Sequence, residues 1–195
     1  MRGIEQIPWL YDGLTAMVDP LGLARWRREL TRTARGRTLE VGCGTGRNLP
    51  LYPPDLHVIG LDPDEAALQR ARHRAPAIPL VRGRVEALPF PDRCFDTVVS
   101  SLVFCSVEEP RKGLAEIRRV LAPDGELRML EHVRARGRCW AGVQDRLQPA
   151  WTWLTGGCRP NRDIEAMVRE AGFRIEGRER KARHVLRRFV ARPLS

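Results

Sequence analysis

The stretch from Leu39 to Asn48, which reads LEVGCGTGRN, constrains the fold of this chain more than any other. An apolar run with one carboxylate leads into Gly42, Gly44 and Gly46. Such a glycine turn lets a ligand approach the backbone closely, because no Cβ stands in the way. The nucleotide fingerprint G-x-G-x-x-G would require a third glycine where this chain has Arg47. The turn therefore does not match the form that binds a dinucleotide pyrophosphate.

A second apolar run, Val58 to Leu61, is followed directly by Asp62. The order of strand, glycine turn, helix, strand and acid is typical of one mononucleotide-binding half of a doubly wound α/β sheet. An ionised carboxylate offers several acceptor sites for hydrogen bonds. We therefore expect Asp62 to bind the ribose hydroxyls of a nucleoside cofactor.

The block LEVGCGTG, with VIGLDP after it, resembles the cofactor site of class I S-adenosylmethionine (SAM) methyltransferases. Two further blocks, EALPFPDRCFDTVVSS at 86–101 and RRVLAPDGEL at 118–127, follow in the order of that superfamily. The resemblance implies a doubly wound, seven-stranded Rossmann-like α/β sheet whose last strand pair is antiparallel. It also implies SAM as the cofactor, a helical N-terminal cap over residues 1–35 and a methyltransferase domain over residues 36–195.

The resemblance assigns the cofactor site to strand ends and the loops that follow them. The residues that it implies are Glu40, Gly42, Cys43, Gly44, Gly46, Asn48, Asp62, Pro63, Val85, Glu86 and Ser101. The chain departs from the family at Arg84, where an acid or an asparagine is common, because arginine cannot accept a hydrogen bond from the adenine amino group. Adenine is then expected to contact the backbone near Val85, or Glu86.

Composition bounds the class of protein. A chain of 195 residues with 43% hydrophobic residues fits one globular domain with a sizeable core. It contains no apolar run long enough to span a membrane, and its first residues, MRGIEQIPWLYDGL, lack the apolar centre of a signal peptide. The five cysteines are scattered and include no C-x-x-C pair, which argues against a disulfide framework and against a zinc site. We predict a cytoplasmic protein without a bound metal.

The net charge of +10 comes almost entirely from arginine, clustered at 25–37, 134–138 and 174–192. A positive field can steer acidic substrates, phospholipid surfaces or nucleic acid, and solvated arginine faces are the simpler explanation. No RNA-binding module is appended, and most of the tryptophans lie outside the basic clusters. We therefore expect a small-molecule acceptor as partner and no specific nucleic acid, keep peripheral membrane contact open, and expect a monomer or a homodimer.

Apolar spacing predicts the elements around these blocks. Helices are expected at 4–18, 23–34, 46–51, 64–73 and 109–121, and strands after the first at 57–61, 78–82, 95–101 and 126–130. Asn161 is expected to cap a last helix, and strands at 173–180 and 184–191 to close the sheet.

The chain after the fourth and fifth strands should border the acceptor, because ligands of open α/β sheets lie outside the carboxyl ends of the strands. The fourth strand ends in SSLVFCSVEEP and the fifth at Glu131 and His132. A histidine there can act as a base for a thiol, hydroxyl or amine, or form part of the wall by hydrogen bonding. Cys105 is either reactive or a small packing residue.

Residues 139–162, CWAGVQDRLQPAWTWLTGGCRPNR, hold three of the five tryptophans. We expect them in an aromatic insertion at about 134–160 that is interrupted by Pro149 and covers an apolar acceptor as a lid. Core packing under the sheet is the competing interpretation.

A closer resemblance rests on LEVGCGTGRN with YPP, then SLVFCSV, MLEHV and PAWTWLTGGCRPNR. These blocks look like those of methyltransferase-like proteins that S-methylate alkyl thiols in animals. The resemblance implies methyl transfer to a thiol, with phospholipid-headgroup or quinone methylation as the alternative and an RNA-binding or RNA-modifying role as a third. The candidate catalytic residues are His132 and Arg162, and the candidate substrate-pocket residues are Tyr11, Phe104, Cys105, Trp151 and Cys158.

Overall fold

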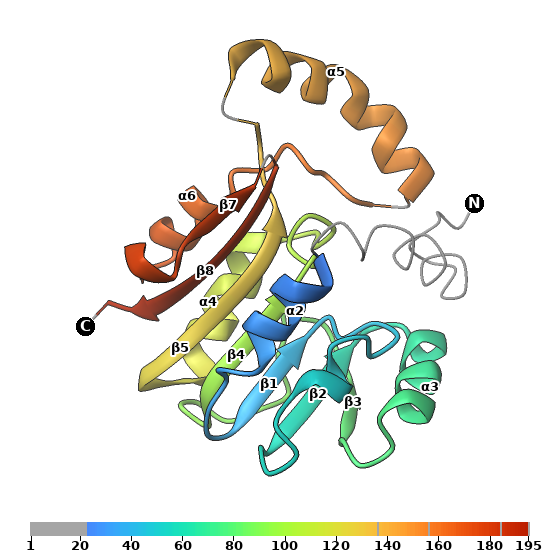
Figure 1. The fold of residues 1–195 in the computed structure, drawn as a ribbon, viewed down its shortest axis with the longest axis vertical. Helices are drawn as coiled ribbons and strands as arrows, with labels where there is room; N and C mark the ends of the chain where they lie inside the picture. The colour runs from blue at the N-terminus through green and yellow to red at the C-terminus, as the bar shows by residue number, and fades with distance from the viewer. Residues whose placement is uncertain (1–22, 136, 156, 184, 195) are drawn as a thin grey trace.

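The computed structural model describes residues 23–135, 137–155, 157–183 and 185–194 of the chain (Figure 1). They form one mixed sheet of eight strands. The strands are β1 (Thr38–Val41), β2 (Val58–Asp62), β3 (Leu80–Arg82), β4 (Phe95–Ser101), β5 (Leu121–His132), β6 (Phe173–Ile175), β7 (Lys181–Arg183) and β8 (Leu186–Pro193). Strands β3, β2, β1, β4 and β5 are neighbours in that order and run parallel, whereas β8 lies antiparallel between β5 and β6. The strand order reverses between β1 and β4, which is the switch point where open α/β sheets bind ligands.

This order confirms the predicted doubly wound sheet with an antiparallel C-terminal pair. The seven strands of the main path are joined by one more, β7, which pairs with β8 off that path. The strand expected at 173–180 ends at Ile175, because the chain turns there through a short 3₁₀ helix, η4 (Gly177–Glu179).

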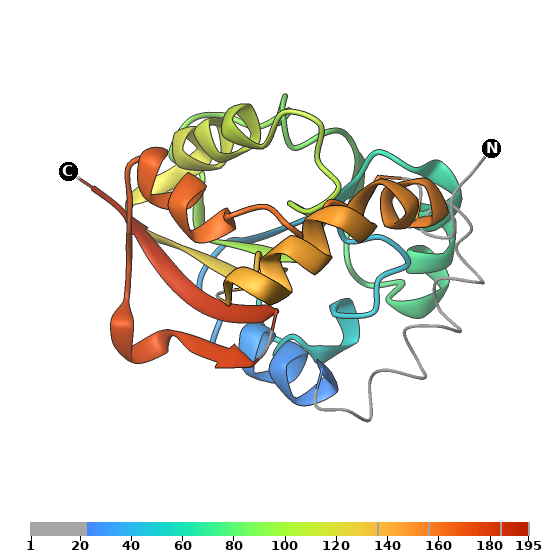
Figure 2. The same cartoon turned by 90° about the horizontal axis from the view of Figure 1, so that it is seen from above.

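Five α-helices accompany the sheet in the described ranges. They are α2 (Leu23–Thr31), α3 (Glu65–Arg74), α4 (Pro110–Val120), α5 (Arg138–Thr155) and α6 (Ile164–Glu170). Viewed from above, α4 and α6 cover one face of the sheet and α2 the other (Figure 2). The helix expected at 4–18, with Tyr11, lies outside the described residues.

The core forms two layers because successive side chains of a strand point to opposite faces. Val98 of β4 packs in the cluster that contains the buried faces of α4 and α6. Its neighbour Val99 packs in the cluster that contains Leu30 of α2 and Leu68 of α3. Burial on both faces explains why two successive residues of β4 are both apolar.

The chain after the glycine turn is less helical than its spacing predicts. Only Leu49–Leu51 forms a short 3₁₀ helix, η3. Gly46 has φ +77°, in the left-handed region, so a right-handed helix cannot run through it. Strand β5, in contrast, is longer than the predicted strand at 126–130. It begins at Leu121 and passes through an irregular stretch at 122–125 before it pairs regularly with β4.

Helix α5 runs from Arg138 to Thr155 through Pro149, so the expected interruption at that proline does not occur. Gln144 holds the helix at both flanks: its Oε1 accepts from the Ala135 amide at 2.9 Å and its Nε2 donates to the Pro160 carbonyl at 2.8 Å. Figure 1 shows α5 beyond the carboxyl ends of the strands, away from the layered core. No helix among the described residues is long and apolar enough to cross a membrane.

Helix α6 is capped by Asp163, not by Asn161 as the sequence suggested. The Asp163 Oδ1 accepts from the Ala166 amide at 3.0 Å, whereas the Asn161 Nδ2 donates to Asp145 at 3.0 Å. The carboxylate also complements the positive end of the helix dipole.

Replacing Asp163 by alanine is expected to lower the free energy of unfolding by about 1 kcal/mol, because one amide at the start of α6 loses its acceptor. Urea denaturation measures the loss. The matched variant Asn161→Ala leaves the cap intact, and a larger loss in that variant than in Asp163→Ala would contradict the assignment of the cap.

Candidate functional site

A cleft of about 390 Å³ opens at the switch point between β1 and β4. Gly44 lies at its floor with φ +54°, and a Cβ built there would meet no atom within 4 Å. The backbone of the turn is thus directly accessible from the cleft. Of the predicted cofactor residues, all except Gly46 line this cleft, and Gly46 packs behind it against Ala71.

Glu40 of β1 is buried at the bottom of the cleft. Its Oε1 accepts from the Asn48 amide nitrogen at 2.8 Å, and the buried Tyr52 hydroxyl also interacts with this carboxyl group. Burial raises the pKa of Glu40 to about 7. A cationic ligand in the cleft would favour the ionised form of this buried carboxyl.

Arg27 of α2 lies beside this carboxyl and lines the same cleft. Its Nη1 donates to the Asn48 Oδ1 at 2.9 Å and to the Ser101 Oγ at 3.5 Å. Arg27, Asn48 and Glu40 therefore form a chain of contacts that places one positive and one negative group in the cleft.

Asp62 ends β2 on the other side of the glycine turn. Its Oδ2 accepts from the Gly44 amide at 2.8 Å and its Oδ1 from the Asp64 amide at 2.9 Å. Burial raises the pKa of Asp62 above its usual value. The two backbone bonds fix the orientation of the carboxylate against the cleft.

Arg84 occupies the position where the family commonly has an acceptor, and it lies at the mouth of the cleft. Its Nη2 pairs with Glu108 at 2.7 Å and lies 3.5 Å from Glu86. Val85 and Glu86 both line the cleft wall. Arg84 therefore ties the two acids together at the rim.

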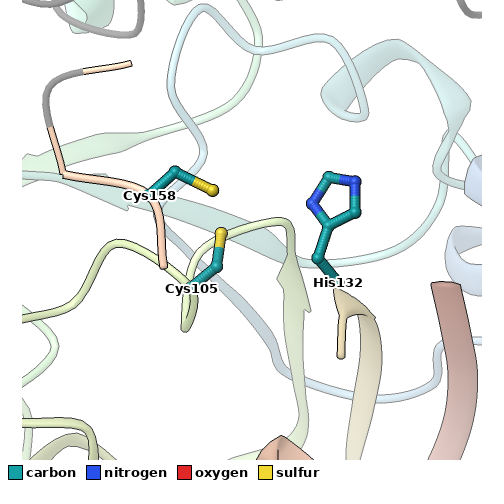
Figure 3. A group of neighbouring side chains, drawn as sticks. All are labelled: Cys105, His132 and Cys158. Carbon is teal, nitrogen blue, oxygen red and sulfur yellow. The ribbon is translucent and has the colours of Figure 1, made fainter. Parts of the chain in front are cut away.

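Three potential ligating side chains meet at the carboxyl end of the sheet. The Sγ atoms of Cys105 and Cys158 and a ring nitrogen of His132 all lie within 4.8 Å of one another. Figure 3 shows both sulfurs and one edge of the imidazole turned toward the same space. They come from the loop after β4, the end of β5 and the loop after α5. The scattered cysteines of the sequence thus converge in a cluster that their spacing did not predict.

His132 is the member of this cluster that can act as a base. Its Nδ1 is buried and has no hydrogen-bond partner in the described part of the chain. Burial lowers the pKa of His132 below its usual value, which favours the neutral imidazole at physiological pH.

The loop that carries Cys105 is held from two sides. The buried Glu131 accepts from Ser100 Oγ at 2.8 Å and from the Val103 amide at 3.0 Å, and burial raises its pKa to about 7. Arg162 donates from Nη1 to the carbonyls of Phe104 at 2.7 Å and Val107 at 2.6 Å, and burial lowers its pKa. Both residues position this loop, and residues 101–103 and 106–108 of the same segment line the cofactor cleft.

A second cavity, of about 640 Å³, lies between α5 and the end of the sheet. Its wall is mainly apolar and includes His132, Trp140, Val143, Leu147, Trp151 and Val185. Trp140 and Trp153 are 73% and 68% exposed, so they do not pack as core under the sheet.

Comparison with known proteins identifies the family. The methyltransferase domain model matches residues 39–129. The thiol S-methyltransferase TMT1B of Homo sapiens is 35% identical over 163 residues, which cover 75% of this chain and 67% of that protein. The chain belongs to the SAM-dependent methyltransferases.

Further relatives differ in their acceptors. TMT1B of Rattus norvegicus is 34% identical, and the match covers 69% of the methyltransferase described here but only 59% of the rat protein. The chain thus spans about three fifths to two thirds of the length of these two relatives. A phosphatidylethanolamine N-methyltransferase of Cereibacter sphaeroides is 39% identical over 103 residues, which cover 50% of this chain and 51% of that protein. A methyltransferase structure from Bacillus halodurans superposes with a TM-score of 0.68 at 22% identity, covering 79% of this chain and 69% of that one.

The cleft of the methyltransferase fits SAM. Glu40 places a buried carboxyl in the wall of the cleft, where a cationic group is expected, Asp62 presents a fixed carboxylate, and Gly44 leaves the backbone open. Sequence reasoning missed Arg27, although its position gave a signal: an arginine lies on the same helix face as Leu23 and Leu30, where an apolar residue is expected.

Candidate acceptor residues fall in different places. Phe104 is fully buried in the core, where it packs beside Gly113, and it lines neither cavity. Trp151 lines the apolar cavity, whereas Cys105 and Cys158 lie in the cluster with His132. Tyr11 lies outside the described residues.

Proposed function

We propose that this methyltransferase transfers the SAM methyl group to the sulfur of a small apolar thiol. The observation that carries the proposal is the position of His132. This residue lines the apolar cavity under α5, and it also lies beside Cys105, whose loop borders the cofactor cleft. The similarity to thiol S-methyltransferases supports the same acceptor.

The residues of the cleft have separate roles in holding the cofactor. Asp62 would accept hydrogen bonds from the ribose, Glu40 would face the α-ammonium, and Arg27 would bind the carboxylate of the methionine part. When bound, SAM supplies a methyl group on a sulfonium, which needs no further activation. Holding both reactants in line can lower the barrier by about 7–11 kcal/mol.

The acceptor must lose its proton to become a good nucleophile. A free thiol has a pKa of about 8.5, so a modest base near neutral pH is sufficient. In the protein without metal, the neutral His132 provides that base, and its Nδ1 is available for the proton. The positive charge of Arg162 close to the cluster would stabilise the thiolate that remains.

The apolar cavity selects the organic part of the acceptor. Replacing Trp151 by alanine is expected to raise the KM for a hydrophobic thiol about tenfold with little change in kcat, because apolar contact area is lost. The matched variant Trp153→Ala removes an indole from the same helix that does not line the cavity. Equal effects of the two variants would contradict the assignment of the cavity to the acceptor.

A turnover assay for S-adenosylhomocysteine tests the function. The panel consists of alkyl thiols, phenols, a demethylated quinone, a short RNA and phosphatidylethanolamine vesicles, each at several concentrations. Turnover with thiols alone is expected. Turnover with vesicles in place of thiols would replace the proposal by headgroup methylation, which the similarity to the C. sphaeroides enzyme favours as the second candidate.

A further inference from the structure

The cluster of Cys105, His132 and Cys158 has the composition of a catalytic zinc site. Such sites use three protein ligands and keep a fourth position for water or substrate. Two thiolates and one imidazole also suit a soft or borderline metal better than Mg²⁺ or Ca²⁺, which prefer oxygen ligands. The described residues within reach thus supply the required number and type of ligands.

The distances allow coordination with small movements. The three ligand atoms lie within 4.8 Å of one another. Around a tetrahedral zinc ion, sulfur and nitrogen ligands lie about 3.5–3.8 Å apart, given bond lengths of about 2.3 Å and 2.0 Å. The ligand atoms must therefore approach one another by about 1 Å to share one ion.

The backbone at the cluster is well fixed. His132 is paired with Leu186 in the β5–β8 ladder. The Cys105 carbonyl accepts from the Arg159 amide at 2.7 Å, and the Cys158 carbonyl accepts from Thr152 Oγ1 at 2.8 Å. Rigid supports of this kind are what a metal site needs to keep its geometry.

The buried Nδ1 of His132 is the independent sign of a missing partner. It is an interior nitrogen without a hydrogen bond among the described residues, and Figure 3 shows a ring nitrogen directed toward the two sulfurs. Orphaned buried polar atoms of native proteins are explained by an ordered water or ion. Two adjacent thiols make an ion the better explanation here.

We infer that Cys105, His132 and Cys158 bind a Zn²⁺ ion whose fourth position takes the sulfur of the acceptor thiol. The role of the ion rests on the proposed thiol acceptor, but the site itself does not. Coordination forms the Zn–S bond, breaks the S–H bond and releases the proton to solvent, so the sulfur keeps the lone pair that attacks the methyl carbon. With zinc bound, His132 is a ligand, and the metal replaces it as the group that ionises the thiol.

The charges balance in this arrangement. Zn²⁺ with two thiolates and a neutral imidazole is uncharged, and a bound acceptor thiolate makes the site negative by one. The Arg162 guanidinium interacts electrostatically with both cysteines and supplies one positive charge. The acceptor is also well placed, because His132 belongs both to the site and to the wall of the apolar cavity.

Metal binding is tested on the full chain under reducing conditions, without reference to activity. The protein is loaded with Zn²⁺ or Co²⁺, dialysed, and its metal content determined by mass spectrometry. One ion per chain is expected, with thiolate-to-cobalt charge-transfer bands in the near ultraviolet and the intense visible bands of a tetrahedral site. Cys105→Ser and Cys158→Ser are each expected to weaken binding at least about tenfold and to reduce the charge-transfer band.

Two controls keep the test decisive. Cys139→Ser removes an exposed cysteine outside the cluster and should retain the ion and the spectrum. Retained SAM binding by calorimetry shows that Cys105→Ser and Cys158→Ser are folded. Equal metal binding by all three variants would overturn the site, as would a disulfide between Cys105 and Cys158 in protein purified without air.

Experiments with the acceptor thiol distinguish the proposed metal site from the proposed thiol acceptor. Adding an alkyl thiol to the cobalt protein is expected to strengthen the charge-transfer band as a third sulfur binds. Thiol turnover that is unchanged after chelation to the metal-free protein would overturn the role of the ion while leaving thiol methylation in place. Stoichiometric metal without turnover of any thiol would uphold the site and overturn the proposed acceptor.

Discussion

Replacing Asp62 by alanine is expected to weaken SAM binding about 100-fold to 1,000-fold, because two charge-assisted hydrogen bonds to the ribose are lost. The substitution also removes the acceptor for the Gly44 amide, which holds the glycine turn in its present shape. Isothermal calorimetry with SAM and with S-adenosylhomocysteine measures the loss. Both ligands share the ribose, so both affinities should fall by the same factor.

Two variants show whether the loss is specific. Asp62→Asn keeps one acceptor oxygen and is expected to cost about tenfold in affinity, since neutral hydrogen bonds are weaker than charged ones. Asp55→Ala removes the same charge from an exposed loop position before β2 and should leave the affinity unchanged. Affinity loss in Asp55→Ala equal to that in Asp62→Ala would show that net charge, not ribose recognition, is responsible.

The cofactor half of the site could be predicted from the sequence because it is local. The glycine turn, Glu40 and Asp62 lie within 25 residues of one another and are placed by two neighbouring strands. Strand ends of a parallel sheet meet at one edge, so a motif at a strand end fixes the location of its side chains. The resemblance to class I methyltransferases, not this local reasoning, predicted the antiparallel end of the sheet.

The resemblance named Cys105, His132 and Cys158 as separate candidates, but their convergence could not be predicted from the sequence, because the tertiary structure brings them together. Cys105, His132 and Cys158 belong to three different segments, and no short spacing links them. A search for C-x-x-C pairs cannot detect such a cluster. Phe104 was predicted to line the substrate pocket because it lies in the loop after β4. Its side chain instead packs in the core, which the sequence of a loop does not reveal.

Capping and helix continuity are also decided by context. Asn161 and Asp163 are both good capping residues, and the structure selects Asp163 because Asn161 is bound to Asp145 of α5. Pro149 was expected to break the lid segment, but the helix continues through it. Pro149 is exposed inside α5, and an exposed helix can tolerate the lost hydrogen bond more easily than a buried one, since water can satisfy the carbonyl.

The affinity for SAM is expected to rise with pH between about pH 5.5 and 7.5, by up to about tenfold per pH unit. Burial raises the pKa of Glu40 to about 7 in the ligand-free protein, so this carboxyl is protonated at lower pH. A cationic ligand favours the ionised form and lowers that pKa. Binding below pH 7 therefore releases a proton, which lowers the affinity, whereas binding above pH 7 does not.

Glu40→Gln separates this group from the others that titrate. The glutamine keeps an acceptor for Asn48 but cannot ionise, so affinity should be lower at pH 7.5 and nearly independent of pH. Calorimetry in buffers of different ionisation enthalpy also measures the proton released, which should vanish in the variant. A full pH slope in Glu40→Gln would assign the dependence to another group.

The same shift affects the stability of the ligand-free protein with the opposite sign. The folded pKa lies above the ordinary value of 4.5, so between pH 4.5 and about 7 the folded chain holds a proton that the unfolded chain has lost. Stability conferred by protonated Glu40 is therefore lost as the pH rises through this window, by about 1.4 kcal/mol per unit. The difference in unfolding free energy between wild type and Glu40→Gln isolates this contribution, because other titrating groups are common to both. The ionised Glu40 carboxylate therefore has two opposite effects: above pH 7 it destabilises the ligand-free protein, and it is also the form that binds the cation.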